Sequence, residues 1–276
     1  MRALSIGARG IAVATALALA GTAGAQAVKV PRAHGYTALD RWPDWSGVWS
    51  PDWSLLFGTG GARPPAQPKL TPAAQARLAA FQAYQKEHGV DQTAQVLCLP
   101  SGMPGIMRQP YPIEFVYSPG RVTIFAETYS QARRIYLNQP VPADPDPYFN
   151  GNSVGHWEGD TLIVDTVGFS PQTDIAPGIK HSDKMKIHER IWLEKPDVMR
   201  IETTITDPEV LAEPFVQQLA YQKKPDWQIR EYVCEENDRD SADAEGRAHL
   251  DLGLDNNGAD PFGPPAAPAK STKKVK

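Results

Sequence analysis

The stretch Gly155-His156-Trp157-Glu158-Gly159-Asp160-Thr161-Leu162-Ile163-Val164-Asp165-Thr166-Val167-Gly168-Phe169 decides the fold of this chain. Glu158-Gly159-Asp160 predicts a tight reversal, because glycine readily adopts the positive φ that such turns need. The residues from Leu162 to Val167 are mostly β-branched or apolar, which predicts a buried strand. Asp165 lies inside this run, and a buried carboxylate is costly unless it is paired or has a task. The stretch therefore predicts a β-hairpin and an interior with polar groups.

Strand-like runs continue along most of the chain, and turns separate them. Because almost no helix lies between them, the runs predict a mostly β fold, either an antiparallel barrel or a strongly curved sheet. A closed barrel of about eight strands can hold one small ligand. The predicted strands are Ile113–Tyr117, Val122–Tyr129, Arg134–Asn138, Thr161–Val167, Lys186–Leu193, Met199–Thr206, Phe215–Tyr221 and Trp227–Cys234.

One peripheral helix is predicted before the strand-rich region. Thr71 is a suitable N-cap, Pro72 fits the first helical position, and Gly89 ends the alanine-rich run. The apolar stripe is thin, so we expect this helix on the outside of a sheet. Earlier in the chain, Trp45-Ser46-Gly47-Val48-Trp49 predicts a first strand whose large indole closes one end of the barrel. An aromatic cluster in the core explains the same residues equally well.

The N-terminus has the pattern of an export signal. Arg2 and Arg9 give a positive start, a short apolar run follows from Ile11 to Ala20, and Ala23-Gly24-Ala25 is a small-residue cleavage site. The run is too short to favour a permanent membrane span, so we expect a soluble periplasmic protein without a membrane anchor. The predicted regions are a signal peptide (1–25), an N-terminal segment with the first strand and the helix (26–97), a barrel region that forms a single domain with residues 42–97 (98–236), and a disordered tail (237–276).

Composition narrows the choice of partners. The net charge of −4 at pH 7 is mild, and no basic stripe precedes the lysine-rich end, which argues against nucleic acid. Cys98 and Cys234 lie far apart in the sequence. In an oxidising compartment they can form one long-range disulfide. Two unpaired, buried thiols are the alternative.

Strand alternation predicts which polar groups face the interior. Glu127, Asp165 and Glu189 each share the parity of apolar neighbours on a different strand. These three carboxylates are therefore expected to converge in one cavity, with Arg133 and Arg134 as the nearby cations. A purely structural ion network and a reactive or ligand-orienting site are both compatible with this pattern.

His181 lies in a loop that leads into the strand of Glu189. A histidine at a barrel mouth can act as a general acid or base near neutral pH. An exposed loop histidine is the alternative, and His156 is a weaker candidate. We predict two sets of site residues: Glu189, His181, Asp165 and Arg134 as catalytic groups, and Glu127, Tyr129, Trp157 and His156 as ligand contacts.

No motif supports a metal or an organic cofactor, and we expect neither. His181, Asp183, His188 and Glu189 fit no established ligand spacing. The chain lacks a Gly-x-Ser-x-Gly elbow and a glycine-rich phosphate loop before a helix. Neither cysteine has neighbours that would activate a thiol.

The chain resembles a large group of exported bacterial proteins of uncharacterised activity. The resemblance covers most of the chain after the signal, and its most specific part is Trp157-Glu158-Gly159-Asp160-Thr161-Leu162. It also rests on Trp45-Ser46-Gly47-Val48-Trp49, Cys98-Leu99-Pro100-Ser101-Gly102-Met103-Pro104, Arg133-Arg134-Ile135-Tyr136, Ser153-Val154-Gly155, His181-Ser182, Glu189-Arg190 and Tyr232-Val233-Cys234. The group implies a lipocalin-like barrel. This chain departs from it at Gly105, where arginine is usual, and at His156, which speaks against a group-wide role for that histidine.

Two functions follow from these residues. The first is a cofactor-independent enzyme of the lyase, isomerase or hydratase type that acts on a small hydrophobic or aromatic compound. Glu189 or Asp165 would be its base, His181 the acid or its partner, and Arg134 would steady developing negative charge. The second is a non-catalytic protein that binds or carries such a compound in the same cavity. A structural protein of the cell envelope is a third possibility.

Overall fold

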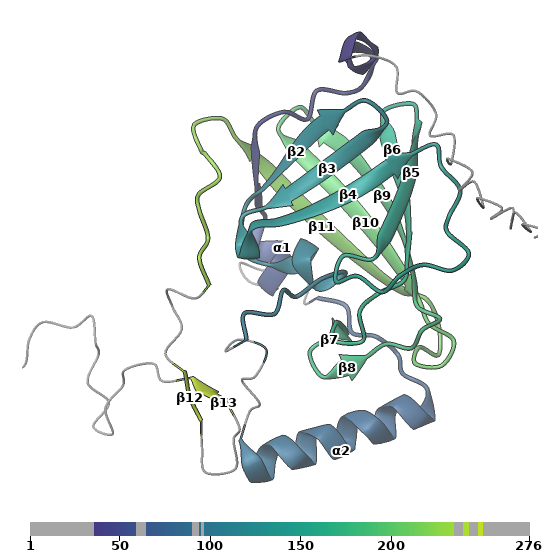
Figure 1. The fold of residues 1–276 in the computed structure, drawn as a ribbon, viewed down its shortest axis with the longest axis vertical. Coiled ribbons are helices and arrows are strands. Elements are labelled where there is room, and N and C mark those ends of the chain that lie inside the picture. Colours follow the sequence, from purple (N-terminus) through teal and green to yellow (C-terminus); the bar gives the residue numbers. More distant parts are fainter. Residues whose placement is uncertain are drawn as a thin grey trace, which may run out of the picture. The chain divides into compact units, whose positions relative to one another are not determined.

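Nine strands of the described residues form a closed barrel (Figure 1). The computed structural model describes residues 36–58, 65–89, 94, 97–234, 240–242 and 248–250. Around the barrel the strand order is β1-β11-β10-β9-β6-β5-β4-β3-β2. The bounds are β1 Val48–Pro51, β2 Ile113–Ser118, β3 Arg121–Ala126, β4 Gln131–Leu137, β5 Asn152–Glu158, β6 Thr161–Val167, β9 Lys186–Lys195, β10 Val198–Thr206 and β11 Phe215–Lys224. The predicted mostly β barrel is confirmed.

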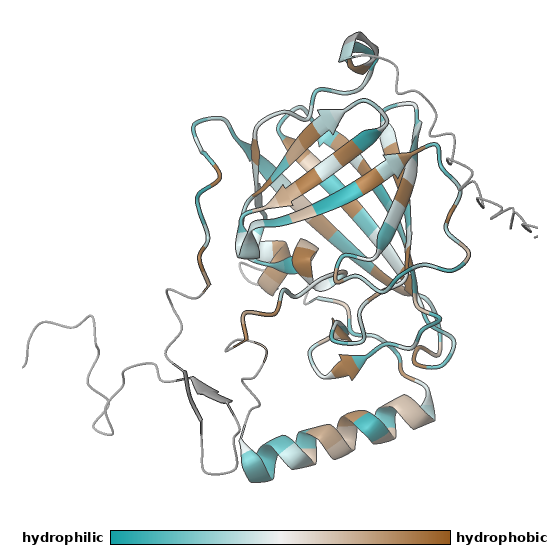
Figure 2. Ribbon diagram, viewed as in Figure 1, coloured by the Kyte–Doolittle hydropathy of each residue, from teal (hydrophilic) through white to brown (hydrophobic). Residues whose placement is uncertain are grey.

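The neighbouring strands are antiparallel, except that β4 and β5 run parallel. A parallel pair requires a crossover, which here is residues 138–151, called the strap below. Along the strands, apolar residues alternate with polar ones (Figure 2), and the apolar faces form one buried core. The interior is filled by large side chains such as Ile124, Ile135, Leu162 and Ile191, each less than 2 % exposed.

The described residues also form smaller elements outside the barrel sheet. They are η1 (Tyr36–Arg41), α1 (Trp53–Phe57), α2 (Pro72–His88), η2 (Gly105–Arg108), η3 (Thr128–Ser130), the paired strands β7 (Asp174–Ala176) and β8 (Ile179–Lys180), and the paired strands β12 (Asp240–Ala242) and β13 (Ala248–Leu250). Within the described part of the chain, no helix is long and apolar enough to cross a bilayer. The predicted signal peptide and most of the predicted tail lie outside the described residues.

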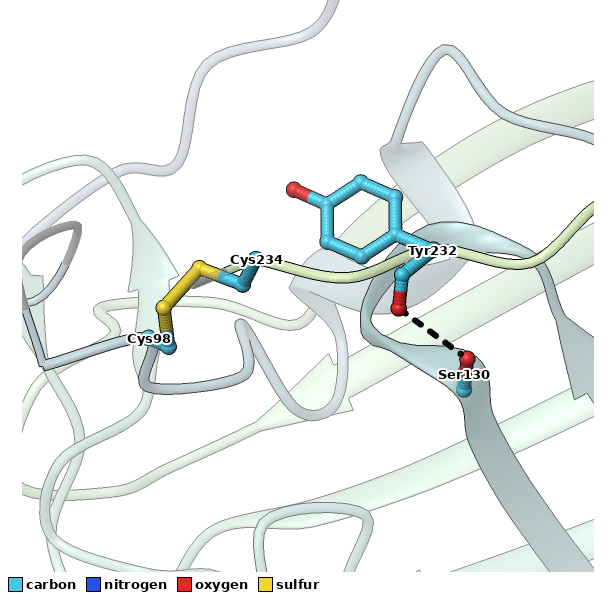
Figure 3. The surroundings of a disulfide bond; sticks show 4 residues. All are labelled: Cys98, Ser130, Tyr232 and Cys234. Atoms are coloured by element: carbon cyan, nitrogen blue, oxygen red, sulfur yellow. Dashed lines mark hydrogen bonds between the residues drawn. A yellow bond between two sulfur atoms is a disulfide. The ribbon is translucent and has the colours of Figure 1, made fainter. Parts of the chain in front are cut away.

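Seven of the eight predicted strands overlap strands of the barrel, and one prediction is wrong. Residues 227–234 form no strand, because the chain leaves the sheet after β11. This part of the chain instead contacts loops. The backbone N–H of Arg230 donates to Glu127 Oε2 at 2.8 Å, and Ser130 Oγ donates to the carbonyl of Tyr232 at 3.4 Å (Figure 3).

A disulfide ends this closing segment (residues 225–234). Cys234 is bonded to Cys98, 136 residues earlier, with a Cα–Cα distance of 5.8 Å (Figure 3). Next to it, the ring of Tyr232 packs against Tyr129 at 5.1 Å and Tyr111 at 5.6 Å. The predicted disulfide is confirmed.

The predicted helix is α2, and its ends follow the sequence signals. The Thr71 hydroxyl accepts from the N–H of Ala74, Pro72 occupies the first turn, and the N–H of Gly89 donates to Gln85. Only Ala74 is fully buried. The helix packs against the small β7–β8 sheet. The Phe81 ring of the helix lies so close to Gly178, in the turn between β7 and β8, that a Cβ added at Gly178 would be 2.7 Å from it.

Aromatic side chains fill the end of the barrel at which the β2–β3 and β5–β6 hairpins turn. The Trp45 ring meets Phe115 at 5.1 Å and Trp157 at 4.9 Å, and the Trp49 indole N–H donates to the carbonyl of Trp45 at 2.9 Å. Trp45 and Trp49 are completely buried. The sequence offered a closed barrel end and an aromatic core cluster as alternatives, and the same residues form both.

At the opposite end, short β1 leaves a seam beside β11. β1 pairs with β11 only at Tyr221–Lys224. The edge of β11 at residues 215–220 that faces away from β10 therefore lies beside α1 and η2 instead of a strand. The backbone N–H of Asp52 donates to Ala220 at 2.8 Å, and the Tyr221 hydroxyl donates to the carbonyl of Met107 at 2.8 Å. Since Ile106 and Met107 are buried, η2 fills the barrel interior next to this seam.

A substitution at Gly155 tests how tightly the β5–β6 hairpin packs against its neighbours. A Cβ at this position would lie 2.7 Å from the carbonyl oxygen of Ile163 and 2.9 Å from Ile135 Cγ2. We expect Gly155→Ala to lower the free energy of unfolding by about 1–3 kcal/mol, because overpacking forces neighbours apart. The outward-facing neighbour provides the control, since His156→Ala should stay within about 0.5 kcal/mol. Urea unfolding measures both, and equal stabilities would contradict the packing described here.

Candidate functional site

The central polar feature of the barrel interior is an ion pair between Arg133 on β4 and Glu189 on β9. The two side chains are 3 % and 0 % exposed, and both guanidinium NH groups bind the carboxylate, with the Nη1–Oε1 distance at 3.1 Å. The same guanidinium donates to Thr166 Oγ1 at 3.1 Å and to Ser153 Oγ at 3.3 Å. These two hydroxyls bond to each other at 2.8 Å.

This pair has the geometry of a structural network. A bidentate arginine–carboxylate contact with further hydroxyl acceptors satisfies buried charges in a way that two isolated ions cannot achieve. Burial, with the nearby charge of Glu189, raises the pKa of the Tyr221 phenol, which therefore stays neutral. The sequence placed Glu189 inside, and the side chain lies there, but Arg133 rather than Arg134 is its partner.

Three predicted positions of side chains are wrong. Arg134 is exposed, because the inward face of β4 carries Arg133, Ile135 and Leu137. Asp165 also faces outward, because the inward face of β6 carries Leu162, Val164 and Thr166. Glu127 follows the end of β3, and its carboxylate binds the backbone of the closing segment instead of entering the barrel. The three predicted carboxylates therefore do not converge.

His181 is held by loop backbone. Its Nδ1 lies 2.7 Å from the carbonyl oxygen of Ser182, and its Nε2 lies 2.9 Å from that of Ser170 and 3.0 Å from Thr173 Oγ1. The adjacent Ser182 is fixed by buried Asp207, which accepts from both its N–H and its hydroxyl. His181 thus organises the loops beside β7 and β8, away from Glu189 and its partner Arg133.

The predicted ligand contacts are dispersed. Trp157 belongs to the aromatic end, where its indole N–H is buried without a partner among the described residues. His156 is exposed and lies 3.3 Å from Glu158 Oε1. Tyr129 packs against Tyr232 of the closing segment. Their predicted roles therefore do not share one site.

A lateral pocket opens at the seam between α1 and β11, with a volume of about 280 Å³. Its walls include Leu55, Leu56, Pro65, Arg108, Gln217 and Leu219. Burial lowers the pKa of the Arg108 guanidinium, and no described residue pairs with it. Gln217 is 7 % exposed, and its amide nitrogen is buried without an acceptor among the described residues. An apolar pocket with two unpartnered donor groups is suited to a ligand that carries an acceptor.

The lateral pocket adjoins the polar interior. In the strand ladder, Gln217 pairs with Thr203, and Thr203 pairs with Glu189. These three inward-facing side chains form a row, with neighbouring strands about 5 Å apart. The row links the wall of the pocket to the ion pair. A second link is the hydrogen bond from the Tyr221 hydroxyl to the carbonyl of Met107, the residue that directly precedes Arg108.

A second concave region, the strap groove, has a volume of about 630 Å³ on the outer face of β6, β9 and β10. Pro142 and Pro145 of the strap line one side, and Asp165, His188 and Thr204 line the sheet side. His188 Nδ1 lies 2.8 Å from Asp165 Oδ1, and both side chains are about half exposed, at 48 % and 47 %. The structure thus pairs the predicted Asp165 with His188, which is exposed on β9 next to the buried Glu189.

Among the described residues, no group of three or more His, Cys, Asp or Glu side chains is arranged to hold a metal ion.

Two residues of the lateral pocket, Gln217 and Arg108, were not predicted from the sequence. Gln217 shares the parity of Phe215 and Leu219, so strand alternation contained a signal for it. Arg108 lies in a short 3-10 turn, where no periodic pattern marks the side chain.

Comparison of the sequence with protein-family models and with curated proteins finds no significant match. The geometry of the barrel and its pockets is therefore the basis on which function is assigned.

Proposed function

We propose that this protein binds a small amphipathic anion, an apolar or aromatic carboxylate, in the lateral pocket. The observation that supports this most directly is the Arg108 guanidinium, which is partly buried without a counter-charge among the described residues. Removing a cation from water is costly unless a partner compensates it. A ligand carboxylate would supply that partner through two parallel hydrogen bonds.

The rest of the pocket agrees with such a ligand. Leu55, Leu56 and Leu219 offer apolar contact to a ring or short chain, and the Gln217 amide offers a donor on the barrel side. The volume is at the lower end of the range for small-molecule sites, which favours a compact compound. The protein would meet this ligand in the periplasm, and the disulfide fits an oxidising compartment.

Benzoate and octanoate, with benzyl alcohol and octanol as uncharged analogues, test this proposal by isothermal titration calorimetry. We expect the acids to bind more tightly than the alcohols. Arg108→Leu should weaken acid binding about ten- to hundredfold, the value of a charge-assisted hydrogen bond, and should leave binding of the alcohols unchanged. Gln217→Leu should have a smaller effect in the same direction.

Arg134→Leu is the matched control, because this arginine is exposed and lines a different part of the surface. It should bind both acids like the unmodified protein. The proposal is wrong if acids and alcohols bind alike, or if Arg134→Leu weakens acid binding as much as Arg108→Leu does.

A second candidate function is acid–base catalysis on a small apolar compound without an organic cofactor. The observation that favours it is the Asp165–His188 pair in the strap groove. Neither Glu189 nor His181 supports it, since the first is saturated by Arg133 and the second by loop carbonyls.

A further inference from the structure

One wall of the strap groove is held against the barrel by contacts of strap residues 145–148. The Asn152 side chain donates to the carbonyl of Asp146 at 2.7 Å, and the N–H of Tyr148 donates to the carbonyl of Gly168 at 3.1 Å. A Cβ at Gly168 would lie only 2.6 Å from Pro145 Cβ, so the strap touches the sheet at this point. Pro142 and Pro145 line the groove opposite β9, and Pro145 is held against the sheet.

The ladder orients His188 within this groove. Asp165 and His188 are directly paired residues of antiparallel β6 and β9. A carboxylate only accepts, so Nδ1 of the imidazole donates to Asp165 Oδ1 at 2.8 Å. In the neutral ring this leaves the lone pair on Nε2, the nitrogen that can take a proton from another molecule. Asp165 is thus a positioning residue that fixes the tautomer.

A cation lies on the same face of the groove. Lys186 precedes His188 by two residues, so the two side chains leave the same side of β9 about 7 Å apart. Lys184 binds Glu209, whereas Lys186 has no ion pair with any described residue. Its ammonium group is available to steady negative charge that develops on a bound molecule.

We propose that the strap groove is a general-base site at which His188 Nε2 removes a proton from carbon in a small aromatic or apolar carbon acid. The C–H bond breaks, its proton forms a bond to Nε2, and its electron pair either becomes an enolate or expels a leaving group. In the first case the proton returns to another atom of the same molecule, which is an isomerisation. In the second the leaving group departs with its bonding electrons, which is an elimination, and the imidazolium then releases the proton to water.

The chain contains a matched comparison for this pair. His156 and Glu158 form a second histidine–carboxylate pair on the outer face, with Nε2 3.3 Å from Oε1. It lies on the same hairpin as Asp165, and neither residue lines the strap groove. A general base needs a held substrate as well as a lone pair, so only the pair within the groove is expected to react.

Nitrobenzisoxazole is a suitable probe, because one proton abstraction opens its ring. The base takes the proton from carbon, the C–H electrons complete a nitrile, and the N–O bond breaks to give a coloured cyanonitrophenolate. We expect His188→Ala to lower kcat/KM about 100-fold or more and His156→Ala to leave it unchanged. Added imidazole should restore activity to His188→Gly and give no increase with His156→Gly. Asp165→Asn should lower kcat about tenfold or more, with KM retained.

Thermal unfolding of each variant separates these effects from loss of the fold. The lateral pocket is a different site and its ligand binding is measured separately by calorimetry, so failure of that binding proposal leaves this one intact. Three results would overturn the general-base site. They are an unmodified protein no faster than His188→Ala, equal losses in the His188 and His156 variants, and a folded His188→Gly variant that imidazole does not rescue.

Discussion

Glu189→Ala is expected to lower the free energy of unfolding by about 3–5 kcal/mol, because it leaves the Arg133 guanidinium buried without its counter-charge. That guanidinium would keep only the hydroxyls of Thr166 and Ser153 as acceptors. Glu189→Gln should also be destabilising, although it keeps the side-chain volume. Its amide N–H groups would face the N–H groups of the guanidinium, where two donors cannot bond.

The control replaces both charges. Arg133→Met with Glu189→Leu fills the same space with apolar groups, and such replacements are often neutral or stabilising. On the outer face of β10, Glu202→Ala should change stability by less than about 0.5 kcal/mol. Urea unfolding with the disulfide intact measures the four variants beside the unmodified protein. A Glu189→Ala variant within 1 kcal/mol of the unmodified protein would show that the ion pair is solvated rather than buried.

The experiment also separates two roles that the sequence left open for Glu189. A structural carboxylate that is removed changes stability first, whereas a reactive one changes turnover while the fold persists. Nη1 and Nη2 of Arg133 both donate to the Glu189 carboxylate inside the barrel. We therefore expect that replacing Glu189 lowers the stability of the fold. Ligand binding in the lateral pocket should survive in the double variant, since Arg108 and Gln217 are unchanged.

Strand alternation predicted the interior correctly where a strand has a clean period of two. In β9, Ile187, Glu189 and Ile191 alternate with exposed polar residues, so Glu189 was placed inside. The same reasoning applied to β4 identifies Arg133, which shares its face with Ile135 and Leu137. The choice of Arg134 neglected this period, and the correct signal was present in the sequence.

Strand alternation gave the wrong face for Asp165 in β6, where a polar residue faces the core. In β6, Leu162, Ile163 and Val164 are all buried, so hydrophobicity alone does not reveal the parity. The inward Thr166 is polar because it binds Arg133 from another strand. Asp165 was therefore assigned to the wrong face, since its outward neighbours Ile163 and Val167 are as apolar as the inward ones. Only the cross-strand pairing resolves this ambiguity.

The lateral pocket and the strap groove were beyond sequence reasoning for a different reason. Each is formed by segments that are far apart in the chain and meet only because the barrel closes. Arg108 reaches β11 because the Tyr221 hydroxyl binds η2, and Pro145 reaches β6 because Gly168 has no side chain. Such contacts depend on loop packing, for which a single sequence carries no periodic signal.

Removing the disulfide is expected to have the other large effect on stability. Cys98 and Cys234 close a loop that contains eight of the nine barrel strands. In the chain-entropy model, cross-linking residues so far apart restricts the unfolded chain enough to stabilise the fold by about 5 kcal/mol. The folded state also gains, because the bond holds Tyr232 against Tyr129 and Tyr111. Cys98→Ser with Cys234→Ser should therefore unfold at a markedly lower denaturant concentration.

Reducing the unmodified protein serves as an independent control, because it breaks the same bond without a substitution. The reduced protein and the double serine variant should show equal free energies of unfolding, and the reductant should not affect the variant further. Tyr232→Ala with the disulfide intact then measures the local aromatic contacts alone, whose loss does not change the loop length. If that variant loses as much stability as the double serine variant, the disulfide acts by holding the closing segment in place. If it loses much less, the bond stabilises the barrel chiefly through the entropy of the unfolded chain, which is the result we expect. Equal stability of oxidised and reduced protein would contradict both explanations.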